Sequence, residues 1–337
     1  MSKVILVDNS SIVHQSIFSW NAQKKRQIET KNETGFILPS SYSYFMSLIS
    51  LLKRVGVNKD DTVILAGDGR NSWRKAFLKE YKAQRKDFRE SHDLIDWNYH
   101  YSKINQTITA IEESTNFHII WLSGIFTFLD LLNTPEGQEF LTENDFDDLM
   151  LEFGLEADDI IATACETFQD RDCVVITKDA DMEQLCVRPN VRFFSMNLKW
   201  KGGTGVYKPV ENGYKILEKK IRLGDKSDNI IIPENDTEID QQIRKLIIDL
   251  IHLPEWVKNP INMILTNLPN KKINYNLLPY QNSLAKRFSQ IYANDKIITY
   301  EDSLKRLERQ KNKVKKKKEK LKKESNFRKL KKEKVKK

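Results

Sequence analysis

The chain has 337 residues, of which 39% are hydrophobic and 31% charged, with a net charge of +9 and three cysteines. Its length allows one large or two ordinary domains, and its composition excludes collagen-like, disulfide-rich and wholly disordered proteins. There is no secretory leader pattern and no run near the roughly 18 apolar residues of a membrane span, so we expect a cytoplasmic protein without membrane association. The cysteines form no CxxC pair, which argues against zinc.

The positive charge is concentrated at one end of the chain. Residues 305–337 hold 19 basic and 4 acidic side chains, a net charge of +15, so the remaining residues carry a net charge of −6. A basic tail of this kind indicates a polyanionic partner such as nucleic acid. It is equally typical of a solvated, disordered extension, and the sequence does not decide between the two.

Short β-branched segments alternate with helical patterns over residues 1–205, which we interpret as the first domain. Strands are expected at 4–7, 62–66, 117–122, 173–177 and 191–195, and helices at 40–55, 72–89, 101–114 and 157–168. Continuous apolar strands separated by helices are typical of a mostly parallel sheet covered on both faces. The sequence therefore predicts an α/β fold.

Two regions depart from this alternation. Residues 124–153 contain a turn followed by an acidic amphipathic segment, and we interpret them as an inserted helical excursion. Residues 206–300 show few strand signals, and their apolar residues recur at helical spacing, which predicts a smaller, mainly helical domain. The Lys-rich tail then occupies residues 301–337.

Three of the expected strands lead directly into aspartate. The first is followed by Asp8, the second by Asp68, and the fourth by Asp179 and Asp181. The carboxyl ends of strands in an open parallel sheet form its ligand crevice, so these carboxylates should gather at one edge. Their mutual repulsion would be costly unless protons or cations compensate it.

Two further acidic groups have helical spacing. Glu156, Asp158 and Asp159 open the helix expected at 157–168, and Asp225 and Asp228 lie three residues apart farther along the chain. Each such residue alone is more simply explained as a helix cap or a turn. Together the nine carboxylates, with no histidine or cysteine beside them, favour Mg²⁺ or Mn²⁺. They fit two-metal hydrolysis of phosphodiesters.

A basic and aromatic segment follows the second strand. Trp73, Phe77 and Tyr81 share one helical face, and a second stripe is basic: Lys75, Lys79, Lys82 and Lys86. Aromatic rings can stack on bases while cations bind phosphates. Packing in the core is the better explanation for Trp73 and Phe77, whereas Arg74 and Lys82 are candidates for contacting phosphate.

These motifs, in this order, resemble the flap endonuclease and 5′-nuclease family, nearest to its phage RNase H branch. The most specific pieces are Glu156-Ala-Asp-Asp159, Lys178-Asp-Ala-Asp181 and Gly224-Asp-Lys-Ser-Asp-Asn229. The resemblance implies a PIN-like nuclease fold. It also implies a metal-dependent 5′→3′ exonuclease and flap endonuclease that removes RNA primers and 5′ flaps in bacteriophage DNA replication, in the cytoplasm of the host.

The resemblance also implies a role for each residue. The first Mg²⁺ would be held by Asp8, Asp68, Glu156, Asp158 and Asp179. The second, which Mn²⁺ could replace like the first, would be held by Asp159, Asp181, Asp225 and Asp228. Arg74 and Lys82 would be the catalytic pair on the scissile phosphate. Further DNA contacts would come from Lys75, Lys79, Arg85, Lys86 and Lys226, and residues 82–101 would form an arch for a single-stranded 5′ end.

The implied substrates are DNA and RNA–DNA hybrids with a free 5′ end or flap. A replication single-strand-binding protein or sliding clamp is the implied partner of a monomeric enzyme. The chain departs from the family at residues 230–236, which lack the glycine-rich turn that grips duplex phosphate. It also departs at the acidic residues 124–153, whose charge predicts a lid or a protein-binding surface and not a DNA contact.

Two alternatives remain. One is a catalytically inactive, structure-specific DNA-binding protein of the same fold, against which the full set of carboxylates argues. The other is a phosphatase of a different α/β fold with an aspartyl nucleophile. Asp179-Ala-Asp181 fits it superficially, but it leaves the other acidic groups unexplained.

Overall fold

The computed structural model describes residues 2–32, 35–142, 145, 147–196, 206–208, 210, 212–292, 305, 309 and 312. The Lys-rich tail lies almost entirely outside this set, so both interpretations of it remain predictions. No helix in the described ranges has the length and apolar composition needed to cross a bilayer.

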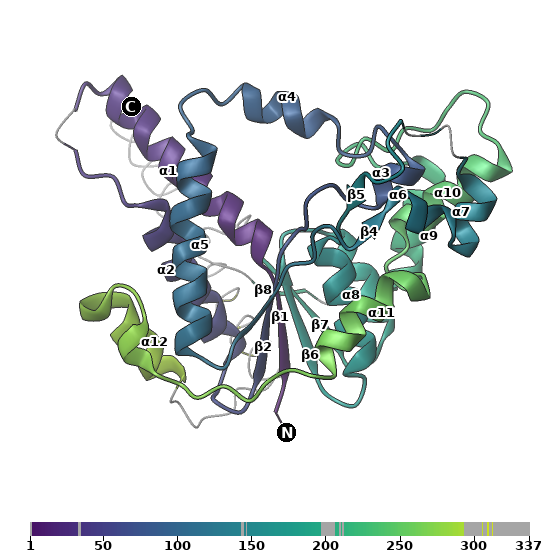
Figure 1. Cartoon of the computed structure of the whole chain (residues 1–337). Coiled ribbons are helices and arrows are strands. Elements are labelled where there is room, and N and C mark those ends of the chain that lie inside the picture. The colour runs from purple at the N-terminus through teal and green to yellow at the C-terminus, as the bar shows by residue number, and fades with distance from the viewer. Residues whose placement is uncertain are drawn as a thin grey trace, which may run out of the picture.

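A six-stranded sheet forms the centre of the molecule, in the order β3-β2-β1-β6-β7-β8 (Figure 1). Its strands are β1 (Val4–Asp8), β2 (Thr62–Ala66), β3 (His118–Ile120), β6 (Cys173–Thr177), β7 (Val191–Ser195) and β8 (Val206–Tyr207). All neighbours are parallel except β8, which runs antiparallel to β7. The predicted mostly parallel α/β sheet is therefore confirmed.

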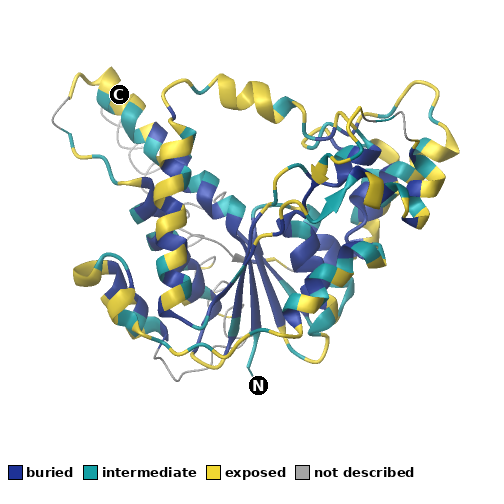
Figure 2. Cartoon of the chain, viewed as in Figure 1, coloured by how far each residue is buried: buried dark blue, intermediate teal, exposed yellow. Residues whose placement is uncertain are grey.

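Alternate residues of the strands enter two separate cores, one on each face. In β1, Val4 and Leu6 belong to one core, and Ile5 and Val7 belong to the other. The first core is covered by α8 (Ala157–Thr167), α9 (Gly213–Leu223), α10 (Glu238–Ile248) and α11 (Glu255–Leu265). The second is covered by α1 (Asn9–Glu29), α2 (Ser40–Val55), α5 (Trp97–Ser114) and α12 (Lys286–Tyr292). Burial on both faces explains why the strands are continuously apolar (Figure 2).

The prediction of a single helix at residues 72–89 is wrong. The chain instead forms α3 (Arg74–Phe77), a turn, and α4 (Gln84–Glu90). The first helix ends where the backbone of Leu78 becomes extended. The chain turns again at Lys82, which has a left-handed φ of 57° and donates its backbone N–H to the carbonyl of Asp228 at 2.9 Å. No residue of α4 is buried, and this helix crosses between the two halves of the molecule beyond the carboxyl ends of the strands (Figure 1).

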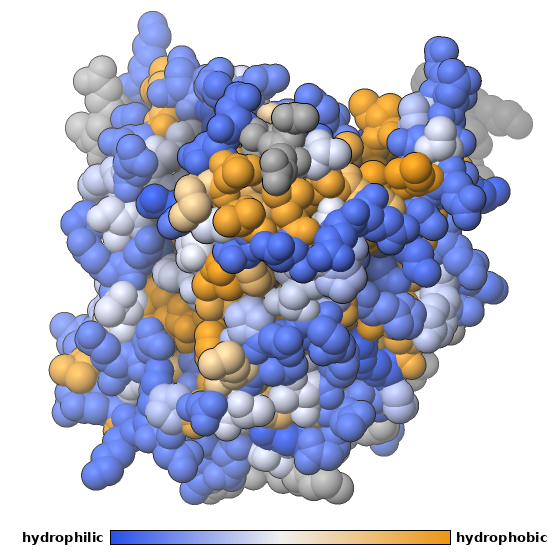
Figure 3. Space-filling model, turned by 45° about the vertical axis from the view of Figure 1, so that its right-hand side comes forward, coloured by the Kyte–Doolittle hydropathy of each residue, from blue (hydrophilic) through white to orange (hydrophobic). Residues whose placement is uncertain are grey.

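Residues 124–153 were predicted to be an inserted helical excursion. The structure adds a small antiparallel sheet that joins the two ends of this segment. Strands β4 (Phe126–Thr127) and β5 (Glu152–Phe153) pair at its two ends, and α6 (Phe128–Leu132) and α7 (Pro135–Phe140) lie between them. Trp256 of α11 anchors this unit by donating its indole N–H to Glu136 at 2.8 Å. Leu129 and Met150 of this segment are 44% and 65% exposed. Figure 3 shows that one face of the molecule carries exposed hydrophobic side chains, coloured orange.

The residues after β7 are mainly helical, but they pack on both faces of the sheet. Helices α9 to α11 join the first core, whereas π-helix η4 (Gln281–Ala285) and α12 join the second. Phe288 of α12 lies 5.9 Å from the ring of Phe45 and 5.7 Å from that of Phe117. A domain boundary at residue 205 remains a prediction.

Candidate metal centre

The three strand-end aspartates lie at one edge of the sheet, because β1 is paired with β2 on one side and with β6 on the other. Asp8 ends β1 and caps α1, accepting the backbone N–H of Ser11 at 3.0 Å. Its other oxygen accepts the hydroxyl of Thr177, the last residue of β6, at 2.6 Å. Burial, and then the nearby carboxylate of Asp68, raise the pKa of Asp8.

The start of α8 brings more carboxylates to the same edge. Glu156 caps this helix, and the backbone N–H of Ala157 donates to Asp68 at 3.0 Å. A helix N-terminus stabilises negative charge. Burial and the neighbouring carboxylate of Asp179 nevertheless raise the pKa of Asp158 well above its usual range. The ionised form of Asp158 is therefore disfavoured at this edge unless a cation compensates it.

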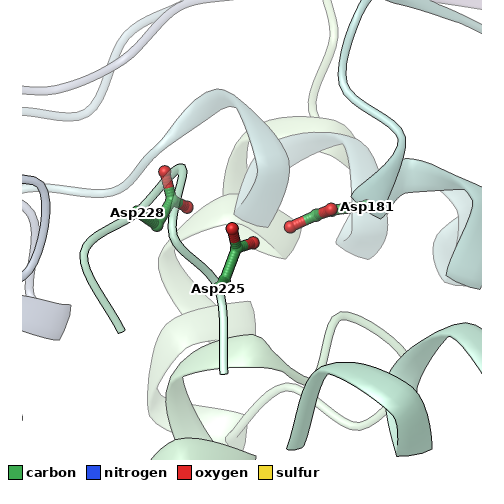
Figure 4. Close-up of side chains that lie close together, drawn as sticks. All are labelled: Asp181, Asp225 and Asp228. Atoms are coloured by element: carbon green, nitrogen blue, oxygen red, sulfur yellow. The ribbon is translucent and has the colours of Figure 1, made fainter. Parts of the chain in front are cut away.

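A second group consists of Asp181, Asp225 and Asp228, which we call the aspartate triad (Figure 4). One carboxylate oxygen from each lies within 4.8 Å of those of the other two, and no other such group occurs in the described ranges. Two members of the triad lie in the loop of residues 225–230. Asp225 and Ile230 close this loop by exchanging two backbone hydrogen bonds, at 2.8 and 2.9 Å. Gly224 has a φ of +69°, and a Cβ there would lie 2.4 Å from the Ile230 carbonyl, so this turn requires glycine.

Lys220 of α9 forms ion pairs with two members of the triad, Asp181 and Asp225. Burial and the carboxylate of Asp179 raise the pKa of Asp181 to about 7 in spite of this lysine. Burial would raise the pKa of Asp225 as well, but hydrogen bonds from Lys220 and Ser227 outweigh it and lower that pKa. Lys220 is not among the residues expected from the sequence, where its only signal is its position five residues before Asp225.

Arg74 and Asp159 form a buried ion pair beside the start of α8. The guanidinium Nη2 and Nη1 lie 2.7 and 3.1 Å from the two oxygens of Asp159, and Nη1 also contacts Glu156 at 3.0 Å. Arg74 is 1% exposed and Asp159 is fully buried. The indole of Trp73 donates to Asp159 at 3.1 Å. This geometry favours an internal structural role, while phosphate contact by Arg74 and metal ligation by Asp159 stay predictions.

Lys82 links the two acidic groups. Its ammonium lies 2.6 Å from Glu156 and 3.7 Å from Asp228, and 4.7 Å from the centre of the Tyr81 ring. The Tyr81 hydroxyl donates to Glu156 at 2.9 Å. Burial would raise the pKa of Glu156, but Lys82 and then Arg74 outweigh it and lower the pKa to about 2.

The base of α4 is attached to the loop that carries Asp228. Arg85 lies 3.0 Å from Asp228, and Gln84 donates to the carbonyl of Ser227 at 2.7 Å. The other predicted DNA-binding lysines are at least partly accessible: Lys75 is half-buried, and Lys79, Lys86 and Lys226 are exposed. Their contacts with DNA remain predictions.

The sequence analysis also missed an aromatic cluster between α1, α4 and α5, made of His14, Phe18, Phe88, His92, Trp97 and Tyr101. Phe88 of α4 is 51% exposed, and its ring lies 5.8 Å from that of Phe18. Burial lowers the pKa of His14, which also responds to the charges of Asp68 and Arg89. The cluster lies near the carboxyl edge because His14 is in the second turn of α1, which begins directly after Asp8. It escaped notice because helix α1 was not among those expected.

The donor chemistry of this edge fits hard divalent cations. All nine predicted ligands offer carboxylate oxygens, and Mg²⁺ and Mn²⁺ prefer such ligands. Of the nine, Asp159 has its oxygens turned to Arg74, Trp73 and the backbone of Glu156. The remaining carboxylates could hold cations on the two sides of Lys82.

No protein-family model matches this sequence, and no curated protein matches it. The chain is similar to a crystal structure of the T5 D15 protein co-crystallised with metal ions, at 18% identity over 86% of this chain and 97% of that one, with a TM-score of 0.43. It is also similar to the T5 5′-exonuclease with bound zinc ions, at 18% identity over 86% and 98% of the two chains and a TM-score of 0.43. At these values the likeness does not bear on the chemistry of the site.

Proposed function

We propose that this chain is a metal-dependent 5′ nuclease, a 5′→3′ exonuclease and flap endonuclease that hydrolyses phosphodiester bonds in DNA and RNA–DNA hybrids. The observation that supports this most directly is the aspartate triad. It lies beside the strand-end carboxylates, since the backbone N–H of Asp181 donates to Asp179 at 2.9 Å. The motifs that resemble the flap endonuclease family cover the same residues. Removal of RNA primers and flaps in phage replication is the biological role that this activity suggests.

In this proposal, two groups of carboxylates hold two Mg²⁺ or Mn²⁺ ions. The first group is Asp8, Asp68, Glu156, Asp158 and Asp179, and the second is the triad. When bound, such ions activate water and neutralise charge on the phosphate. Such cations would favour the carboxylate forms of Asp8 and Asp158, against the burial and neighbouring carboxylates that raise their pKa values.

Lys82 is the residue of this chain that we propose to act on the phosphate. Its ammonium lies between Glu156 and Asp228, so it contacts one carboxylate of each acidic group. The Lys82 side chain is 12% exposed. A cation at this point would stabilise negative charge as it builds on a phosphate oxygen. Arg74, with its donors committed to Asp159, Glu156 and a backbone carbonyl, holds the helix start in place.

The single-stranded part of the substrate would pass under α4. The aromatic cluster offers ring faces for stacking, and exposed cations such as Lys86 and Arg89 on the same helix can contact phosphates. This surface reads no base sequence, which fits an enzyme that recognises a free end or flap. A single-strand-binding protein or clamp would deliver a monomeric enzyme to such ends.

Cleavage of a 5′-labelled flap and of an RNA-primed duplex tests the proposal. We expect short labelled products that require Mg²⁺ or Mn²⁺, disappear with a chelator, and are lost in Asp179→Ala. A chromogenic phosphate monoester should not be hydrolysed, which separates the nuclease from a phosphatase. Tight, structure-specific binding without cleavage in either metal would instead indicate an inactive DNA-binding protein.

A further inference from the structure

Lys220 bridges two members of the aspartate triad. Its ammonium pairs with both Asp181 and Asp225, and its side chain is only 20% exposed, against 16% and 8% for these two partners. The third member, Asp228, pairs with Lys82 and Arg85. Every carboxylate of the triad is therefore balanced by a cation of the chain itself.

Three carboxylates this close together are favoured in their ionised form by a compensating positive charge. Like charges at short distance repel each other, and one oxygen of each of the three carboxylates lies within 4.8 Å of those of the other two. The ion pairs with Lys220 help to offset this repulsion, and they lower the pKa of Asp225. The ammonium thus compensates part of the negative charge of the triad.

The ammonium and a divalent cation would compete for the same oxygens. An Mg²⁺ ion binds carboxylate oxygen at about 2.0–2.1 Å, so an ion bound to the same oxygens of Asp181 and Asp225 would occupy the position of the ammonium. The two cations would also repel each other at that distance. One of them has to leave.

We propose that Lys220 is a resident counter-ion of the second metal position, which a divalent ion must displace. This rests on the proposed function only in taking the triad as a metal site. Lys220 then weakens binding of the second ion in exchange for a stable metal-free protein. Occupancy of that position, and with it cleavage, becomes dependent on the concentration of free divalent metal.

Metal binding without nucleic acid tests this with Lys220→Met and a matched control, Lys219→Met. Lys219 is the adjacent residue of α9 and is exposed, so both variants lose one positive charge from the same helix. In calorimetric titrations with Mn²⁺, we expect the weaker binding event to tighten at least tenfold in Lys220→Met and to change little in Lys219→Met. Without metal, Lys220→Met should melt at a lower temperature than the control, and saturating Mn²⁺ should remove the difference.

Equal or weaker Mn²⁺ affinity in Lys220→Met than in Lys219→Met would overturn the inference, even if the wild-type protein binds two ions and cleaves flaps. Lys220→Gln, which keeps hydrogen-bond donors without the charge, provides a second variant that should also bind Mn²⁺ more tightly. If neither variant folds at saturating Mn²⁺, the inference is also wrong, because a bound ion should replace the ammonium. Absence of cleavage by a wild-type protein that binds two ions would count against the proposed function alone.

Discussion

Arg74 and Asp159 meet in a two-pronged ion pair under the candidate metal centre, with nitrogen–oxygen distances of 2.7 and 3.1 Å. The pair joins α3 to the first turn of α8, where Asp159 also accepts the backbone N–H of Glu156 at 2.9 Å. It fixes the helix start that presents Glu156 and Asp158. Arg74 therefore supports the site from within the protein, because its guanidinium contacts the buried carboxylates of Asp159 and Glu156.

Loss of this pair should be costly. Removing one partner of a buried ion pair destabilises a protein by about 3–5 kcal/mol, because the other charge is left unpaired. We expect Arg74→Ala and Asp159→Asn each to lower the free energy of unfolding by that amount in urea titrations, with Arg85→Ala as the exposed control. If Arg74→Ala instead kept full stability and only slowed cleavage, Arg74 would contact the phosphate.

Replacing Asp158 should stabilise the protein in the absence of metal, whereas loss of the Arg74–Asp159 pair should destabilise it. Burial and Asp179 raise its pKa, so in the folded apoprotein its ionised form is costly above its ordinary pKa of about 4. Without metal, this cost grows as the pH rises from that value toward the raised pKa of the folded state. Asp158→Asn should therefore melt at a higher temperature than wild type at pH 7 in a chelator, by roughly 2–4 °C per kcal/mol gained.

The same variant should lose cleavage and most of the stabilisation that added Mg²⁺ or Mn²⁺ gives to the wild type, since an ion stabilises only the state that binds it. Thermal melts with and without metal, next to flap cleavage assays, check both parts. Near-wild-type turnover in Asp158→Asn would contradict the assignment of Asp158 to a metal.

Lys82 should act on the chemical step more than on binding. Because negative charge grows on the phosphate as it reacts, a cation held there gains most in the transition state. We expect Lys82→Ala to lower the single-turnover rate at least about a hundredfold, the scale for one lost electrostatic donor. Lys86→Ala, an exposed lysine of the following helix, should change mainly the dissociation constant. If Lys82→Ala also changed only affinity, Lys82 would be a general phosphate-binding residue.

The parts of the fold that the sequence predicted are those that depend on local patterns. Continuous apolar strands and the aspartates after them follow from chain-local rules, because parallel strands bring their carboxyl ends to one edge. The break at Lys82 could not be predicted in this way. Its left-handed backbone is held by the carbonyl of Asp228, 146 residues away in the sequence.

The roles of individual charges were equally hard to predict. Nothing in the local sequence distinguishes Arg74, which turns inward to Asp159, from Lys75 beside it, which is partly exposed. Lys220 escaped notice for a similar reason, since an amphipathic helix has several lysines and only the packing of α9 shows which one reaches the triad. The local sequence therefore does not predict which charged side chain contacts a partner that is far away in the chain.

The aromatic cluster provides a prediction for single-stranded substrate. Stacking of a base on an aromatic side chain contributes about 1–3 kcal/mol, and Phe88 is the ring that α4 adds to the cluster. Phe88→Ala should weaken binding of a single-stranded flap by roughly tenfold, measured in Ca²⁺ to prevent cleavage, and leave blunt duplex binding unchanged. Phe36, which is 82% exposed in the loop before α2, supplies the control substitution to alanine.

The basic tail should add affinity without specificity. Residues 305–337 carry a net charge of +15 on a body of −6, and a polycation binds nucleic acid by releasing counterions from phosphates. Truncation before Lys305 should weaken duplex binding at low salt and reduce the slope of log affinity against log salt. The single-turnover rate at saturating enzyme should stay unchanged, because every predicted metal ligand precedes the truncation. Both proteins would be titrated with one flap substrate at several salt concentrations in Ca²⁺. Superimposable slopes would show that the tail does not touch nucleic acid, and a protein partner would then explain its charge better.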